Sequence, residues 1–183
     1  MSSLEILENR NGKLFIDRVS ATRLAQEFDT PLYVMSETRI RQNYQNIYHA
    51  LARNYEKIRI YYSAKANANI SVLRILKSEG AYLDAVSPGE VFLALKAGFP
   101  ARRIIFTGTS VRNDELKFLL NSNVMINIDS TSQLNRLLKL ATPNFLSIRI
   151  NPNIGAGHHE HCITAGKDSK FGLGEDDAVR AYE

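Results

Sequence analysis

The chain has few of the features that direct a protein out of the cytosol. It contains a single cysteine, Cys162, which excludes an internal disulfide and suits a reducing compartment. Its N-terminus lacks a basic region followed by an apolar run, and nowhere do about 18 apolar residues stand together. The sequence therefore predicts a cytoplasmic protein without a leader or a membrane span.

The chain also lacks a basic cluster of the kind that binds nucleic acid. Its net charge is +4, but the lysines and arginines are scattered among acids and do not alternate with aromatic residues. This charge balance is compatible with a general attraction for anionic small molecules, and so with an enzyme that acts on them. With 183 residues, 44% of them hydrophobic, the chain is long enough to bury the core of one domain or slightly more.

Expected strands and helices alternate along most of the chain. The strands are predicted at residues 32–35, 58–63, 82–86, 104–107, 125–128 and 145–150. From the second strand onward their ends recur every 21 or 22 residues, at Lys65, Val86, Thr107, Ile128 and Ile150. Repeated βα units of this length predict a parallel sheet, because parallel neighbours need a crossover connection.

Two α/β architectures accommodate such a sheet, an open doubly wound sheet and a (β/α)8 barrel. The first βα turn has no Gly-x-Gly-x-x-Gly, and polar residues follow nearly every strand instead of one switch point. These residues are Lys65, Asn67, Ser87, Thr107, Asp129 and Asn151. The distribution favours the barrel, of which six of the eight units are predicted here, so we expect the N-terminal part of a longer protein.

The first 30 residues do not fit the repeat. They predict a short strand at 13–16 and a short helix at 20–28, ended by Asp29-Thr30-Pro31. We expect an adaptor segment at 1–30 that packs with a C-terminal β-domain, and a partial barrel at 31–183. Within the barrel, Ser87 and Glu90 form a capping box, as do Ser130 and Gln133, so Glu90 is expected to bind the N-cap amide and not to be catalytic.

Lys65 is the candidate nucleophile. It leaves an apolar strand and enters a polar turn, where a primary amine in partly apolar surroundings has a lowered pKa and can attack a carbonyl to make a Schiff base. The alternative is a solvated lysine without chemistry, as at most strand ends.

Six short motifs give the chain a family resemblance. They are Tyr-Ser-Ala-Lys-Ala-Asn at 62–67, Asp-Ala-Val-Ser-Pro-Gly-Glu at 84–90, Phe-Thr-Gly at 106–108, Asn-Ile-Asp-Ser at 127–130, Arg-Ile-Asn-Pro at 149–152 and Ser-Lys-Phe-Gly at 169–172. In this order and spacing they resemble the alanine-racemase-like, pyridoxal-phosphate-dependent decarboxylases, and the diaminopimelate decarboxylases most of all.

The resemblance implies that Lys65 holds pyridoxal phosphate as a Schiff base and that Asp84 and Arg149 lie near the cofactor. A pairing of Asp84 with Arg149 would orient the lysine and set the local charge. The alternatives are a strand-end or capping role for Asp84 and a structural ion pair for Arg149.

The loop at 155–162 contains three histidines, a glutamate and Cys162, a set that suggests a metal site. Their spacing is too tight for one tetrahedral ion and lacks the His-Glu-x-x-His form, so no metal is predicted. The resemblance implies that His159 and His161 lie at the active-site mouth or a dimer contact. It places Lys170 at the subunit interface, with an exposed cation as the alternative.

The function implied by the resemblance is decarboxylation of meso-2,6-diaminopimelate to L-lysine by a cytoplasmic homodimer. The alternatives are a related decarboxylase for ornithine, arginine or a carrier-bound amino acid, and a non-catalytic barrel that binds pyridoxal phosphate. The family's ring-stacking histidine and glycine-rich phosphate loop come after Glu183, so residues 1–183 alone are expected to be inactive.

Overall fold

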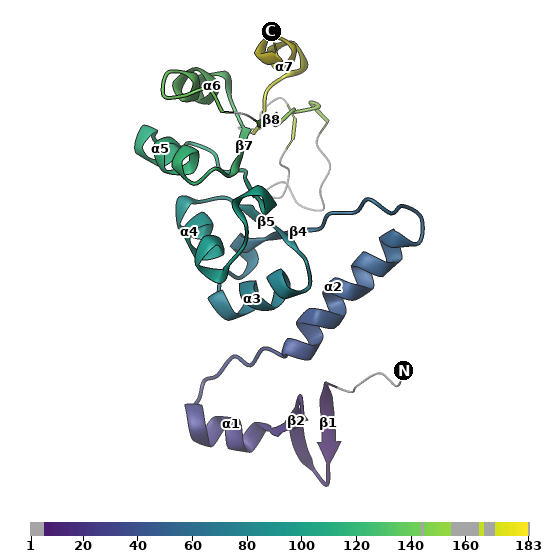
Figure 1. The fold of residues 1–183 in the computed structure, drawn as a ribbon. Coiled ribbons are helices and arrows are strands. Elements are labelled where there is room, and N and C mark those ends of the chain that lie inside the picture. Colours follow the sequence, from purple (N-terminus) through teal and green to yellow (C-terminus); the bar gives the residue numbers. More distant parts are fainter. Residues whose placement is uncertain (1–5, 144, 155–164, 167–170, 183) are drawn as a thin grey trace.

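The structure, a computed structural model, describes residues 6–143, 145–154, 165–166 and 171–182. They form two separate sheets, one antiparallel with the order β1-β2-β3 and one parallel with the order β4-β5-β6-β7-β8 (Figure 1). Among these residues no helix has the length and apolar character needed to cross a membrane.

The N-terminal unit is a small antiparallel sheet followed by one helix. It consists of β1 (Leu7–Arg10), β2 (Lys13–Ile16), β3 (Val19–Ser20) and α1 (Ala21–Phe28). Asn11 and Gly12 both have positive φ in the turn between β1 and β2, the conformation that two-residue hairpins require. The predicted strand at 13–16 and helix at 20–28 are confirmed, and they lie in a unit apart from the parallel sheet (Figure 1).

The parallel sheet places consecutive strands side by side. Its strands are β4 (Tyr61–Ser63), β5 (Tyr82–Ala85), β6 (Ile104–Phe106), β7 (Met125–Ile128) and β8 (Leu146–Ile148). The helices are α2 (Glu37–Ala52), α3 (Ile70–Ser78), α4 (Pro88–Ala97), α5 (Asn113–Asn121), α6 (Thr131–Leu138) and α7 (Glu175–Tyr182), with short 3-10 turns η1 (Ala64–Ala66) and η2 (Ala101–Arg103). Helices α3 to α6 follow one side of the sheet (Figure 1), which is the arrangement of a partial βα barrel.

The strand predicted at 32–35 is not formed, so the described parallel sheet has five strands instead of six. Parallel strands are stabilised by burial of both faces and by backbone pairing on an adjacent strand. The four side chains of this segment are exposed, Tyr33 to 97%, and among the described strands β4 pairs only with β5. Apolar composition alone therefore does not make this segment a strand.

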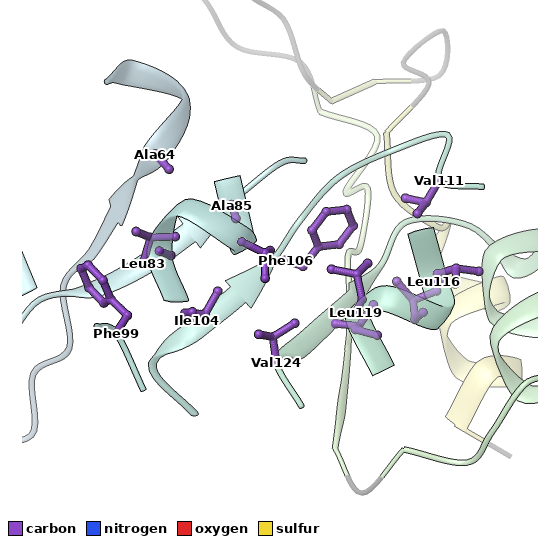
Figure 2. Packing of buried hydrophobic residues seen from close by; sticks show 14 of the residues in the cluster. Ala64, Leu83, Ala85, Phe99, Ile104, Phe106, Val111, Leu116, Leu119 and Val124 are labelled. Atoms are coloured by element: carbon purple, nitrogen blue, oxygen red, sulfur yellow. The ribbon is translucent and has the colours of Figure 1, made fainter. Parts of the chain in front are cut away.

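The helix-facing side of the sheet forms the hydrophobic core. Leu83 and Ala85 on β5, and Ile104 and Phe106 on β6, are at most 1% exposed and pack among helix side chains such as those labelled in Figure 2. Side chains alternate between the two faces of a strand. The intervening positions therefore face the other side, where the polar side chains of Ser63, Asp84, Asn127 and Ser147 lie.

A charged network joins α2 to α3. The Arg41 guanidinium contacts the carboxylates of Glu37 and Glu79, and Gln45 Nε2 donates to Glu79 Oε2 at 2.8 Å. Hydrogen bonds from Arg41 and Gln45 lower the pKa of the Glu79 carboxyl, which is 12% exposed. The same network raises the pKa of Arg41.

We predict that Glu79→Gln lowers the free energy of unfolding by about 1 kcal/mol at pH 7, because a hydrogen-bonded charge pair is lost. The lowered folded-state pKa means that the stabilisation is complete above the ordinary glutamate pKa, about 4.3, and is lost as pH falls through the folded value. Urea unfolding at pH 7 and pH 3 measures both effects. The matched control is Glu37→Gln, whose side chain is 59% exposed and should cost only a few tenths of a kcal/mol. Equal losses for the two variants would contradict this account of the network.

Candidate active site

Lys65 lies at the carboxyl end of β4, as predicted. The strand ends at Ser63 and turns into η1, where Ala64 is fully buried and the Lys65 side chain is exposed. The hydroxyl of Tyr62, on β4, donates to the carbonyl of Asn67, on the far side of the turn, at 3.1 Å. Burial raises the pKa of Tyr62, so this hydroxyl remains a proton donor. The amine therefore projects from a turn that is anchored on both sides.

Asp84 lies on β5 directly opposite Ser63 on β4. Ser63 Oγ donates to Asp84 Oδ2 at 3.1 Å, and Thr107 Oγ1 donates to Asp84 Oδ1 at 2.5 Å. Thr107 directly follows β6, where its backbone N–H continues the ladder by donating to the Ala85 carbonyl at 2.8 Å. Three adjacent strand ends thus hold one carboxylate by both of its oxygens.

Arg149 forms its ion pair with Asp129 and not with Asp84, so the predicted pairing is wrong. Arg149 Nη1 lies 3.6 Å from Asp129 Oδ1, and the guanidinium lies 4.4 Å from the centroid of the Phe171 ring. The cause is strand order: Asp129 follows β7, the neighbour of β8, whereas two strands separate β5 from β8. At the usual spacing of parallel strands, that separation is about 14 Å along the sheet.

Asp129 and Asn151 are buried polar residues, whereas their sequence pattern predicts only that they follow strands. Asp129, 7% exposed, also accepts from the Gly172 N–H at 3.1 Å. Asn151 Oδ1 accepts from the backbone N–H groups of Asn153 and Gly166 at 3.0 Å each. Their position directly after a predicted strand was the sequence signal that could have identified them as site residues. Both are buried and hydrogen-bonded, as buried polar side chains usually are.

Glu90 and Gln133 are capping residues, with one difference from expectation. Ser87 Oγ accepts from the Glu90 N–H at 3.2 Å, but Glu90 Oε2 accepts from the N–H of Val86, which precedes the N-cap, at 2.8 Å. Gln133 likewise accepts from the Asp129 N–H at 2.9 Å. Each cap therefore also ties the residue before its N-cap, at the end of the preceding strand, to the following helix.

The remaining predicted residues lie outside the described part of the chain. His159, His161 and Lys170 belong to the undescribed ranges 155–164 and 167–170. Among the described residues no group of three histidine, cysteine, aspartate or glutamate side chains is placed to hold a metal ion.

The carboxyl edge of the sheet combines a primary amine, a carboxylate and a guanidinium. The ion pairs formed among the described residues leave Lys65 and Asp84 without an oppositely charged partner, while Asp129 and Arg149 neutralise each other. An exposed amine at a strand end is accessible to an aldehyde, and neighbouring charges of both signs suit an aldehyde that carries ionisable groups. These residues fit the carbonyl end of pyridoxal phosphate.

Comparison with known proteins identifies the class. Residues 37–183 match the family described as pyridoxal-dependent decarboxylase, pyridoxal binding domain, and the chain belongs to this family. Pyridoxal phosphate is the cofactor of these enzymes, which confirms the predicted cofactor, and the barrel-type fold is confirmed as well.

Several individual relatives are diaminopimelate decarboxylases. The enzyme of Methanothermobacter thermautotrophicus is 51% identical over 97% of this chain and 42% of its own length, and that of Aquifex aeolicus is 37% identical with the same shares. The crystal structure of the M. jannaschii enzyme with L-lysine has a TM-score of 0.83 and 34% identity, covering 97% of this chain and 44% of that one. The chain thus spans about 42% of the length of the curated relatives.

Close packing around residue 108 explains why the Phe-Thr-Gly motif ends in a glycine. A Cβ at this position would lie 2.6 Å from the Val86 carbonyl oxygen and closer still to the Phe106 ring. Only glycine therefore fits where the loop after β6 approaches Val86, the residue that follows β5. Thr107 directly precedes Gly108, so this close packing also fixes its position.

We predict that Gly108→Ala lowers the free energy of unfolding by about 1–3 kcal/mol through overpacking against Phe106 and Val86. Chemical denaturation of the variant measures the loss. Gly174→Ala is the matched control, because a Cβ there meets nothing within 4 Å. A Gly108→Ala protein as stable as the control would show that the loop has free space.

Proposed function

We propose that this chain forms the pyridoxal-binding part of an enzyme that decarboxylates meso-2,6-diaminopimelate to L-lysine. The observation that carries the proposal is Lys65 at the end of β4, next to a carboxylate held on β5, with Arg149 farther along the same edge. The similarity to enzymes named diaminopimelate decarboxylases supports the substrate.

The residues of the chain have distinct tasks. Lys65 Nζ would hold the aldehyde carbon of pyridoxal phosphate, with loss of water, and, once the substrate's amine had taken its place, would hold a proton near the reacting carbon. Asp84 places a carboxylate beside the strand of Lys65, and Arg149, paired with Asp129, lies farther along the same edge. When bound, the cofactor supplies the electron sink that takes up the electron pair left by departing carbon dioxide.

The wider assembly is part of the same proposal. The enzyme acts in the cytoplasm, a reducing compartment that suits the single cysteine, and it acts as a homodimer. His159, His161 and Lys170 contribute at the active-site mouth or the subunit contact. Residues 1–30 serve as an adaptor that packs with a further β-domain. Their separate antiparallel sheet supports this division.

A related amino acid is the second candidate substrate. The lysine/ornithine decarboxylase of Vibrio vulnificus shares the fold with a TM-score of 0.60 at 25% identity. The higher identity to the diaminopimelate enzymes favours diaminopimelate.

We predict that a protein with the full length of these relatives, carrying this chain, releases carbon dioxide from meso-diaminopimelate when given pyridoxal phosphate. The panel includes L-lysine, L-ornithine and L-arginine, which should give no more than background. Lys65→Ala should abolish release because the amine that binds the cofactor is lost, while Lys57→Ala, before β4, should leave it unchanged. Faster turnover of another amino acid would assign a different substrate. Normal cofactor absorbance without any release would favour a non-catalytic binding protein.

A further inference from the structure

We propose that Thr107 is the residue that positions Asp84 for its action on Lys65. The inference rests on the proposed function and deepens it, because it assigns a role at the same site to a side chain two strands away from the lysine. The hydrogen bonds of Thr107 go to Asp84 and to the Ala85 carbonyl, so its effect on Lys65 passes through the Asp84 carboxylate.

Of the two hydrogen bonds that hold the Asp84 carboxylate, the one from Thr107 is the shorter. Its hydrogen bond to Asp84 Oδ1 is 2.5 Å long, within the range of strong O–H to carboxylate bonds, whereas the bond from Ser63 to Oδ2 is 3.1 Å. Because the two donors come from the strands on either side of β5, they set the plane of the carboxylate between β4 and β6. Loss of the shorter bond would free this plane to rotate.

The charges along the edge make Asp84 the carboxylate available to Lys65. Asp129 is paired with Arg149 and accepts from the Gly172 amide, while Glu90 accepts from the Val86 amide. On the lysine turn itself, the Tyr62 hydroxyl donates to a backbone carbonyl. Among the described residues Asp84 accepts from two neutral hydroxyls and forms no ion pair, so its carboxylate is the one available to a cation on the neighbouring strand.

A well-oriented carboxylate stabilises positive charge on the nitrogen that joins Lys65 to the cofactor. Misorientation of Asp84 should therefore lower the pH at which this nitrogen loses its proton, without preventing attachment of the cofactor. A merely structural role for Thr107 would change stability and leave this pH unchanged.

The experiment is a pH titration of the visible absorbance of the lysine-bound cofactor in the full-length protein. We expect Thr107→Val, which keeps the shape but removes the hydroxyl, to lower the midpoint by about 0.5–1 pH unit, in line with the partial loss of one charge-assisted hydrogen bond. Thr107→Ser should restore the wild-type midpoint, and Asp84→Asn should give the largest shift. Thr109→Val, the same change two residues further along, is the matched control and should have no effect.

A wild-type midpoint in a folded Thr107→Val protein would overturn the inference and leave the proposed function standing. Absence of a lysine-bound cofactor in the wild-type protein would overturn the proposed function itself. If Thr107→Val does not fold, Ser63→Ala decides. A smaller shift of the midpoint in the same direction supports the inference that the Ser63 and Thr107 hydroxyls together orient Asp84, and no shift overturns it.

Discussion

The register of β4, β5 and β6 is the constraint on which the site depends. Ser63 lies opposite Asp84, and the Thr107 N–H bonds to the Ala85 carbonyl, so three strand ends meet within hydrogen-bonding distance. A slip of one residue in β5 would turn Asp84 toward the helices and bring Leu83 and Ala85 to the polar face. The cost of burying a carboxylate and exposing two core residues specifies the register, and the register places Asp84 beside the strand that leads to Lys65.

The two faces of the sheet therefore have separate roles. The helix-facing side is apolar and nearly closed to solvent, and it holds the strands in place. The opposite side is polar, with hydrogen bonds between neighbouring strands from Ser63 to Asp84 and from Ser147 to Asn127. At the carboxyl edge Asp129 and Arg149 compensate each other, and among the described residues Asp84 and Lys65 form no ion pair.

Much of the fold could be predicted because strand ends and caps depend on local sequence. The intervals that end at Val86 and Ile128 match β5 and β7, and Ser87 and Ser130 cap the helices expected of them. Residues 32–35 have the composition of a strand, but the formation of a strand also depends on a pairing partner and on burial, which are tertiary properties. The family resemblance implied that Asp84 pairs with Arg149, and the structure pairs Arg149 with Asp129 instead. Partner choice depends on which strands are adjacent, and Asp129 on the neighbouring strand is the nearer acid.

The central claim is that Lys65 is the residue that binds pyridoxal phosphate covalently. The most direct measurement is reduction of the cofactor-loaded protein with borohydride, followed by peptide mapping by mass spectrometry. The account predicts a single pyridoxyl group on the peptide that contains Lys65, and none on peptides containing Lys57 or Lys77. A protein labelled stoichiometrically at another lysine, with Lys65 unmodified, would contradict it.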